Sequence, residues 1–224
     1  MRSVVVSCFA ALLLIGGPAA VAATDVQTIV LIRHGEKPSA GLGQLDCRGL
    51  NRSLALPGVI GARFGRPDAV FAPDPAHAKP DHIRSYDYVR PLATVEPTAI
   101  SFGLPVNTQF GYADTDALAG ELERPRWRSS LLLVAWEHVE LVKLARRLLA
   151  DAGGNAGQVP GWAYGDYDGI YVIRISRGSD GVRASFERQQ QHLDGQSTQC
   201  PGPRAPSPSG DPAFPAPAPA PAAS

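Results

Sequence analysis

The strongest constraint on the fold is an apolar, β-branched run, residues 29–32, that ends abruptly in Arg33 and His34. Such a run is short enough to be a strand that is buried on both faces, as in a parallel sheet covered by helices. Ligands of open α/β sheets bind at the carboxyl ends of the strands. We therefore expect an α/β fold with charged chemistry at the end of this strand.

The residues at this strand end suit an anionic substrate. Arg33 offers a planar fork of N–H donors that fits a phosphate group. A neutral His34 imidazole is a nucleophile that phosphorus can accept. Gly35 lets the chain turn without a side chain in the path of a ligand. The alternative is an ordinary capped turn, and the rest of the chain has to decide between the two.

A second apolar run, residues 131–136, is also followed by a histidine, His138. A helical pattern comes next, with Leu141, Leu144 and Leu148 on one face. His138 is therefore expected between the end of a strand and the start of a helix, a position that favours anions. Two histidines that terminate the two most apolar strands of the chain are expected to act together.

The segments between these strands continue the alternation of strands and helices that is typical of α/β proteins. A weak helical pattern over residues 50–64 contains Pro57, so we expect helix on one or both sides of that proline and not through it. A short strand is expected over 68–72, followed by a loop over 73–87 and a helix that starts near Tyr88.

This loop and helix carry further candidate residues. Pro91 suits a first helical turn, which places Arg90 at a helix N-terminus, where anions bind. Arg84 is a rival for the same role. The histidines of the loop, His77 and His82, fit no standard metal-ligand spacing and are expected to be solvated surface residues.

The second half of the chain is expected to hold one more short helix and a hairpin. The helix is predicted over 116–122, with Asp116 as its N-cap. A strand over 168–175 and a turn over 177–181 lead into residues 182–188. We therefore expect the chain to finish as an antiparallel pair at the edge of the sheet.

Both ends of the chain differ from its middle. Residues 1–23 combine Arg2, an apolar run and small residues in the order of a cleaved signal peptide. Cys8 precedes most of that run, so lipidation is not expected. Pro, Ala, Ser and Gly dominate residues 201–224, which are expected to be disordered. The predicted domain therefore spans 24–200 and is periplasmic or secreted, with no membrane span after signal removal.

Charge and cysteines add two further expectations. The formal net charge of the 224 residues is zero, which indicates neither a nucleic acid nor an anionic membrane surface as partner. Without the signal peptide the chain keeps Cys47 and Cys200. In an oxidising compartment they could form a disulfide, with two free thiols as the alternative. The sequence carries no signal of the oligomeric state.

The sequence Arg-His-Gly-Glu at residues 33–36, followed by Arg90 and then His138, resembles the signature of the histidine phosphatase superfamily. The resemblance implies the phosphoglycerate mutase-like fold, a single three-layer α/β domain with a mainly parallel sheet, in an exported member of branch 1 type. It also implies that His34 is phosphorylated during turnover, and that Arg33, Arg90 and His138 bind the phosphoryl group. No cofactor is required.

The chain also departs from the family. Val139 follows the second histidine, where the family usually has glycine or another small residue, and Glu137 precedes it. This departure affects the expected local contacts of the substrate. The family often uses an acid to protonate the leaving oxygen, and four residues are candidates: Asp114, Asp116, Glu121 and Glu137.

The expected activity is that of a histidine acid phosphatase-like enzyme, which hydrolyses small phosphomonoesters. A mutase is a further possibility within the same fold. A protein that binds a phosphorylated ligand without catalysis is an alternative from another class, because the proton donor is not assigned. The natural substrate is not evident from the sequence.

A metal-dependent hydrolase is the enzymatic rival. The chain has two His-x-Glu pairs, His34 with Glu36 and His138 with Glu140. Arg33 argues against a metal ion beside the first histidine, because it would add like charge to that site.

Overall fold

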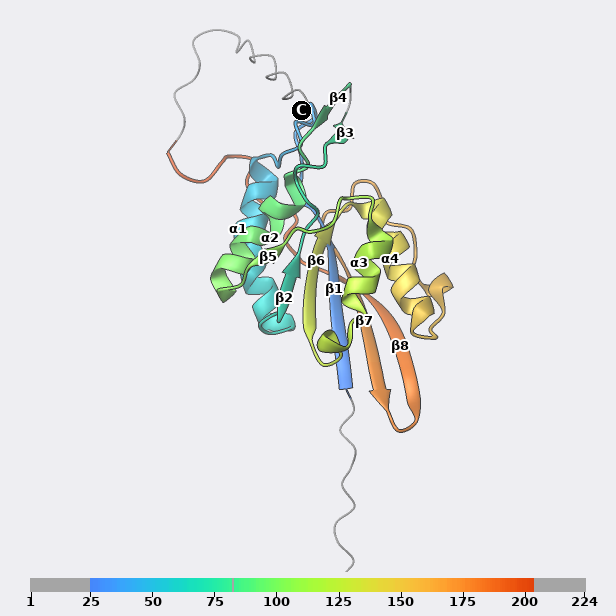
Figure 1. Cartoon of the computed structure of the whole chain (residues 1–224). Coiled ribbons are helices and arrows are strands. Elements are labelled where there is room, and N and C mark those ends of the chain that lie inside the picture. Colours follow the sequence, from blue (N-terminus) through green and yellow to red (C-terminus); the bar gives the residue numbers. More distant parts are fainter. Residues whose placement is uncertain (1–24, 82, 204–224) are drawn as a thin grey trace, which may run out of the picture.

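The computed structural model describes residues 25–81 and 83–203, and it contains one six-stranded sheet with helices on both faces (Figure 1). The strands of this sheet are β1 (Asp25–Arg33), β2 (Ala69–Phe71), β5 (Val106–Asn107), β6 (Leu131–Trp136), β7 (Gly169–Gly178) and β8 (Gly181–Gln190). The α-helices are α1 (Cys47–Arg63), α2 (Arg90–Phe102), α3 (Thr115–Leu122) and α4 (His138–Asp151). Two 3₁₀ turns span Pro125–Trp127 and Ala156–Gln158.

The sheet has the strand order β5-β2-β6-β1-β7-β8. The first four of these strands are parallel to one another, whereas β7 is antiparallel to β1 and to β8. This arrangement confirms the predicted α/β fold, with β1 and β6 as adjacent central strands. It also confirms the predicted antiparallel pair at the edge.

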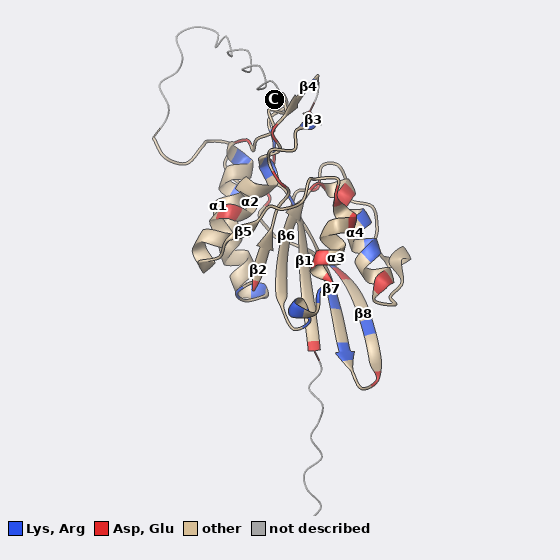
Figure 2. Cartoon of the chain, viewed as in Figure 1, with Lys and Arg blue, Asp and Glu red and all other residues tan. Residues whose placement is uncertain are grey.

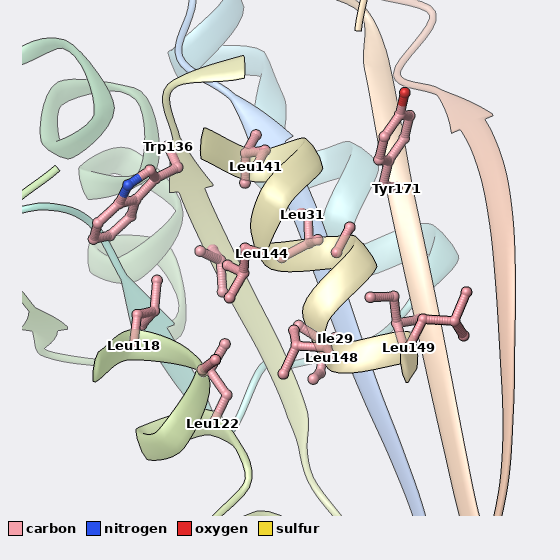
Figure 3. Close-up of a cluster of buried hydrophobic side chains, with 14 of the residues drawn as sticks. Ile29, Leu31, Leu118, Leu122, Trp136, Leu141, Leu144, Leu148, Leu149 and Tyr171 are labelled. Atoms are coloured by element: carbon pink, nitrogen blue, oxygen red, sulfur yellow. The ribbon is translucent and has the colours of Figure 1, made fainter. Parts of the chain in front are cut away.

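The side chains of β1 alternate between two apolar layers. Ile29 and Leu31 pack in the layer formed with α3 and α4, which Figure 3 shows. Val30 and Ile32 pack in the layer formed with α1 and α2. All four side chains are fully buried. Because burial of such a side chain contributes about 1.5–3 kcal/mol, both faces of this short strand stabilise the fold.

Helix α1 corrects the prediction for Pro57. The helix runs through this proline, although a proline inside a helix removes one backbone hydrogen bond and costs about 3 kcal/mol or more. Leu56 and Ile60 on the same helix are completely buried, and each contributes about 1.5–3 kcal/mol. Arg52 adds ion pairs from within the helix. Tertiary packing therefore outweighs the local penalty.

The loop predicted over 73–87 also needs correction, because it contains a two-stranded hairpin, β3 (Lys79–Asp81) and β4 (Arg84–Tyr86). The sequence shows no apolar alternation there. The hairpin is instead held by charge contacts, since Asp81 forms ion pairs with Lys37 and Arg90 outside it.

A disulfide joins Cys47 and Cys200 across 153 residues of sequence, which confirms the predicted pairing.

The predicted signal peptide, His82 and nearly all of the predicted disordered tail lie outside the described residues. Within the described ranges, no helix is both long enough and apolar enough to cross a membrane. Figure 2 shows charges of both signs on α4, whereas the central strand β6 has none.

Candidate active site

The two histidines predicted to act together lie at the same end of the sheet. β1 and β6 are parallel neighbours, with Arg33 paired to Trp136 in the register. The backbone N–H of His34 donates to the carbonyl of Trp136 at 3.1 Å. His138 is the first residue of α4, directly after the β6 end. The chain therefore presents both imidazoles at the carboxyl edge, where α/β sheets bind ligands.

His34 is buried, with 3% of its surface exposed. Its Nδ1 lies 2.7 Å from the carbonyl oxygen of Gly35, which can only accept a hydrogen bond, so the ring proton is on Nδ1. The Nε2 atom consequently keeps its lone pair. Burial, followed by the positive charge of Arg90 and then of Arg33, holds the pKa of His34 well below its ordinary value. The ring is therefore a neutral nucleophile at neutral pH.

Gly35 connects the end of β1 to α2. Its N–H donates to the Thr94 hydroxyl at 2.9 Å, and that hydroxyl donates to the carbonyl of Arg90 at 2.8 Å. A Cβ atom at Gly35 would lie 3.0 Å from the Cα of Gly49, closer than nearly all real contacts. A side chain here would therefore push α1 away from the histidine turn.

Arg33 is almost fully buried, with 1% exposed. Its guanidinium donates to the carbonyls of Tyr164 and Asp166, and its Cζ lies 4.0 Å from the ring centroid of Tyr167. Burial lowers the pKa of Arg33, and the neighbouring Tyr167 and Glu137 offset only part of this effect. In the part of the chain that the structure describes, no carboxylate forms an ion pair with this guanidinium.

Arg90 begins α2, as predicted, and is buried. One of its terminal nitrogens lies 2.5 Å from Asp81, whose second oxygen lies 2.5 Å from Lys37. Burial alone would raise the pKa of Asp81, but Lys37 and Arg90 lower it, so the carboxylate is ionised. Arg84, the rival for this role, is exposed on β4.

Glu137 joins His138 to the α4 N-terminus. One oxygen accepts from the N–H groups of Val139 and Glu140 at 2.8 and 3.0 Å, and the other lies 2.7 Å from His138 Nδ1. The second contact is close but lacks regular hydrogen-bond geometry. Burial raises the pKa of Glu137, but the contacts with His138 and the helix N-terminus outweigh it and hold the pKa at about 2.

The other three proton-donor candidates have partners of their own. Asp116 is exposed and pairs with Arg147 at 2.7 Å. The prediction that Asp116 is the N-cap of α3 is wrong, because the helix starts at Thr115 and Asp114 takes the cap position. Asp114 accepts from the N–H of Gly111 at 3.0 Å, which stabilises the preceding turn. Glu121 is buried among three partners: Arg124, Arg126 and Trp127.

Buried polar atoms without a hydrogen-bond partner concentrate at this site. Among the described residues they are Arg33 Nε, Tyr88 Oη, Arg90 Nε, Thr98 Oγ1 and His138 Nδ1. The last of these lies close to Glu137, but not in hydrogen-bond geometry. An unmade hydrogen bond of a buried group costs about 1–3 kcal/mol. All but Thr98 belong to the site, so the fold holds donors there that a ligand could satisfy.

The glutamates of the two His-x-Glu pairs have other partners. Both oxygens of Glu36 accept from Arg52, at 2.8 and 2.9 Å. Glu140 pairs with Lys143 at 2.7 Å. Within residues 25–81 and 83–203, no three His, Cys, Asp or Glu side chains form a group that could hold a metal ion. The ligand set that a metal hydrolase needs is therefore not assembled from these pairs.

Several site residues were not predicted from the sequence. Tyr88, Asp81 and Lys79 come from the hairpin and the turn before α2, and Tyr164 and Tyr167 come from the segment before β7. The alternation of Lys79 and Asp81 on one short strand was a usable signal, because it puts both charges on one face. The tyrosines had none, since their positions depend on how distant segments fold together.

No protein-family model matches the sequence, and no curated protein matches it. Solved structures do show partial similarity. A protein described as a phosphohistidine phosphatase from Nakamurella multipartitia has 16% identity and a TM-score of 0.48, over 74% of this chain and 96% of that chain. A mycobacterial glucosyl-3-phosphoglycerate phosphatase has 16% identity and a TM-score of 0.48, over 73% and 98%.

A phosphoglycerate mutase from Plasmodium falciparum has 13% identity and a TM-score of 0.46, over 77% of this chain and 96% of that chain. With TM-scores below 0.5, these similarities do not establish a function. The function proposed below therefore depends on the residues of the site.

Proposed function

We propose that this protein is an exported phosphomonoesterase of the histidine phosphatase superfamily that acts through a phosphohistidine on His34. The observation that carries the proposal is the state of this imidazole. Its Nδ1–H is held by the Gly35 carbonyl, Nε2 keeps its lone pair, and two buried arginines lie close enough to lower the pKa of the ring. A neutral nucleophile beside two cations suits attack on a phosphate ester.

In the first half of the reaction, Nε2 of His34 attacks phosphorus. A P–N bond forms while the P–O bond to the leaving alcohol breaks. Arg33 and Arg90 bind the equatorial oxygens and stabilise their charge in the transition state, with His138 as a further donor. Each arginine has an Nε–H free of protein partners within the described ranges, so neither must give up a bond of that atom to bind the oxygens.

The leaving oxygen takes a proton from the Glu137–His138 pair. Of the four acidic candidates, Glu137 is the one whose charge acts on His34 and Arg33. Because Glu137 is a carboxylate in the free site, the His138 imidazole carries the transferred proton, and the negative charge of Glu137 beside it favours this arrangement. In the second half, water attacks the phosphohistidine, the pair takes up a proton from this water, and neutral His34 is restored with release of phosphate.

A ligand-binding protein without activity and a mutase use the same residues and stay as alternatives. A mutase must protect its phosphohistidine from water, whereas a phosphatase admits water. Export, which the N-terminal sequence predicts, would separate the protein from cytosolic sugar phosphates and favour hydrolysis. The proposed substrate class is small phosphomonoesters.

The test is a panel of phosphomonoesters assayed with the wild type and with His34→Ala. The substitution removes the nucleophile, so the rate should fall by several powers of ten while the fold persists. The matched control is His77→Ala, since His77 is an exposed histidine whose ring forms an ion pair with Asp74 at 3.0 Å. This control should keep the wild-type rate, and EDTA should change neither rate.

Acid quench during turnover of a phosphate-labelled substrate separates the alternatives. The wild type should retain label in an acid-labile, base-stable linkage, and His34→Ala should retain none. Activity that is lost with EDTA and restored by zinc would favour a metal hydrolase. A protein that binds phosphate but never becomes labelled would favour the binder without activity.

A further inference from the structure

Tyr88 is the most deeply buried of the three site tyrosines, and it has no role in the mechanism above. It is fully buried, and its ring stands edge-on to that of His34, with 6.0 Å between the centroids. The Cζ atom of Arg90 lies 4.9 Å from the centroid of the Tyr88 ring. Tyr88 therefore contacts both the candidate nucleophile and one of the two candidate phosphate-binding arginines.

The hydroxyl of Tyr88 makes no hydrogen bond of regular geometry within the described part of the chain, and its neighbour Arg90 can only donate, so no group there accepts the hydroxyl proton. Buried tyrosines usually find an acceptor, and Tyr171 does so here by donating to the Pro160 carbonyl at 3.2 Å. Burial raises the pKa of Tyr88 well above its ordinary value, although Arg90 and Arg33 favour the ionised form. The hydroxyl consequently keeps its proton and is available as a donor.

A buried hydroxyl without a hydrogen-bond acceptor lowers the stability of the free protein, and a ligand that accepts this hydrogen bond removes the cost. The charges that act on this hydroxyl are those of the site itself, namely Arg90, Glu137 and Arg33. The hydroxyl therefore lies within the electrostatic reach of both arginines, whose Nε–H groups also have no partner among the described residues. All three donors are neutral or positive, which suits an oxyanion and not a cation.

We propose that the Tyr88 hydroxyl donates a hydrogen bond to a non-bridging oxygen of the bound phosphoryl group, as a further residue of the phosphate site. This inference rests on the proposed function, because it assumes that phosphate binds between His34 and the arginines. It assigns a binding role to a residue that the sequence motifs did not include. It also explains why a polar atom is buried next to His34 without a partner.

The test is Tyr88→Phe in the full chain, with inorganic phosphate as the probe in calorimetric titration. The substitution keeps the ring and removes the hydroxyl. Because hydrogen bonds to charged groups contribute about 1.5–3 kcal/mol, phosphate should bind about 10- to 100-fold more weakly. The thermal midpoint of the free variant should stay equal or rise, since an unpartnered hydroxyl is lost.

Thr98→Val is the matched control. Among residues 25–81 and 83–203, Thr98 is the other buried hydroxyl without a partner, and it lies eight residues after Arg90 on α2, about 12 Å of helical rise away. This variant should also keep or raise the thermal midpoint, but it should bind phosphate like the wild type. A general effect of removing buried hydroxyls would instead change phosphate binding in both variants, and that would overturn the inference.

Unchanged phosphate affinity in Tyr88→Phe would overturn the inference, even if the wild type still forms a labelled phosphohistidine. Weaker phosphate binding in Tyr88→Phe would support it, even if acid quench finds no label and the catalytic proposal fails. A wild type that binds no phosphate would overturn the role of Tyr88, and the labelling result would still judge the catalytic proposal separately.

Discussion

The chain buries arginines in two clusters that differ in how completely they are bonded. In the first cluster, Arg52 makes five hydrogen bonds, to Glu36, Asp168, Gln191 and Asp194. In the second cluster, Arg33 bonds only to backbone carbonyls, and the Nε–H groups of Arg33 and Arg90 have no partner in the described ranges. All three side chains are at most 3% exposed.

The pKa values of Arg52 and Arg33 shift in opposite directions, in line with the bonding of the two clusters. Burial opposes the charge of Arg52, yet its bonds to Glu36, Asp168 and Asp194 more than compensate and raise its pKa. Burial lowers the pKa of Arg33 without such compensation. A buried charge without a carboxylate costs stability, and Arg33 carries this cost at the end of β1, whereas Arg90 shares the Asp81 carboxylate with Lys37. The comparison indicates that Arg52 stabilises the fold, whereas Arg33 and Arg90 are kept for a ligand.

Among the tests of this comparison between the two clusters, the largest expected effect is on the rate of phosphomonoester hydrolysis in Arg33→Met. Loss of this charge should lower the rate by about 10² to 10⁴ through weaker stabilisation of the transition state. The free energy of unfolding in urea should change little, because no carboxylate loses its partner and only the carbonyls of Tyr164 and Asp166 lose a donor. A rate within threefold of the wild type, or a large loss of stability, would place Arg33 with Arg52 as a structural residue.

The next effect is on stability, in Arg52→Met. This change strands buried carboxylates, including Asp168, and should lower the free energy of unfolding by about 3–5 kcal/mol. Urea denaturation measures this loss. The folded fraction should still bind phosphate, since Arg52 has no donor in the site. A variant as stable as the wild type would mean that the five bonds of Arg52 contribute nothing net.

The smallest effect is on the pH dependence of the free energy of unfolding, and it concerns Glu137, whose charge acts on Arg33 of the second cluster. Glu137 has a pKa of about 2 in the folded protein against an ordinary 4.5. Its contribution to stability is therefore fully present above about pH 4.5, is about 3 kcal/mol, and is lost as the pH falls to about 2. In Glu137→Gln, the acid-induced loss of unfolding free energy over this range should be smaller by that amount.

The control for Glu137→Gln is Glu187→Gln, which removes an exposed ion pair with Arg174. Exposed pairs contribute little, so this control should keep the acid dependence of the wild type. If Glu137→Gln also keeps it, the carboxylate is not ionised by its contacts with His138 and the α4 N-terminus.

The sequence predicted the parts of the fold that local patterns determine. The apolar runs placed β1 and β6 at the centre, and the turn after residue 177 placed the last two strands at the edge. The position of Arg90 at a helix start followed from Pro91. These features depend on residues that are neighbours in the sequence, which is why local patterns predict them.

The features that the sequence did not predict depend on contacts between distant segments. Pro57 stays inside α1 because the helix packs on the sheet and Arg52 pairs with residues as far away as Asp194. The β3–β4 hairpin is held by ion pairs between Asp81 and two cations outside it. The alternation of Lys79 and Asp81 indicates a short strand, but no local pattern reports the ion pairs that hold the hairpin or the place of Tyr88 in the site.

The bonds of Arg52 also bear on when the site is completed during synthesis. Arg52 holds Glu36, two residues after His34, but its partners Gln191 and Asp194 come 139 and 142 residues later in the chain. A nascent chain therefore exposes the candidate nucleophile long before the groups that fix its surroundings exist. Domains made from the N-terminus onward often fold in that order. In the folded protein, the surroundings of the turn after β1 therefore include groups from the C-terminal segment, and they are complete only when this segment lies against α1.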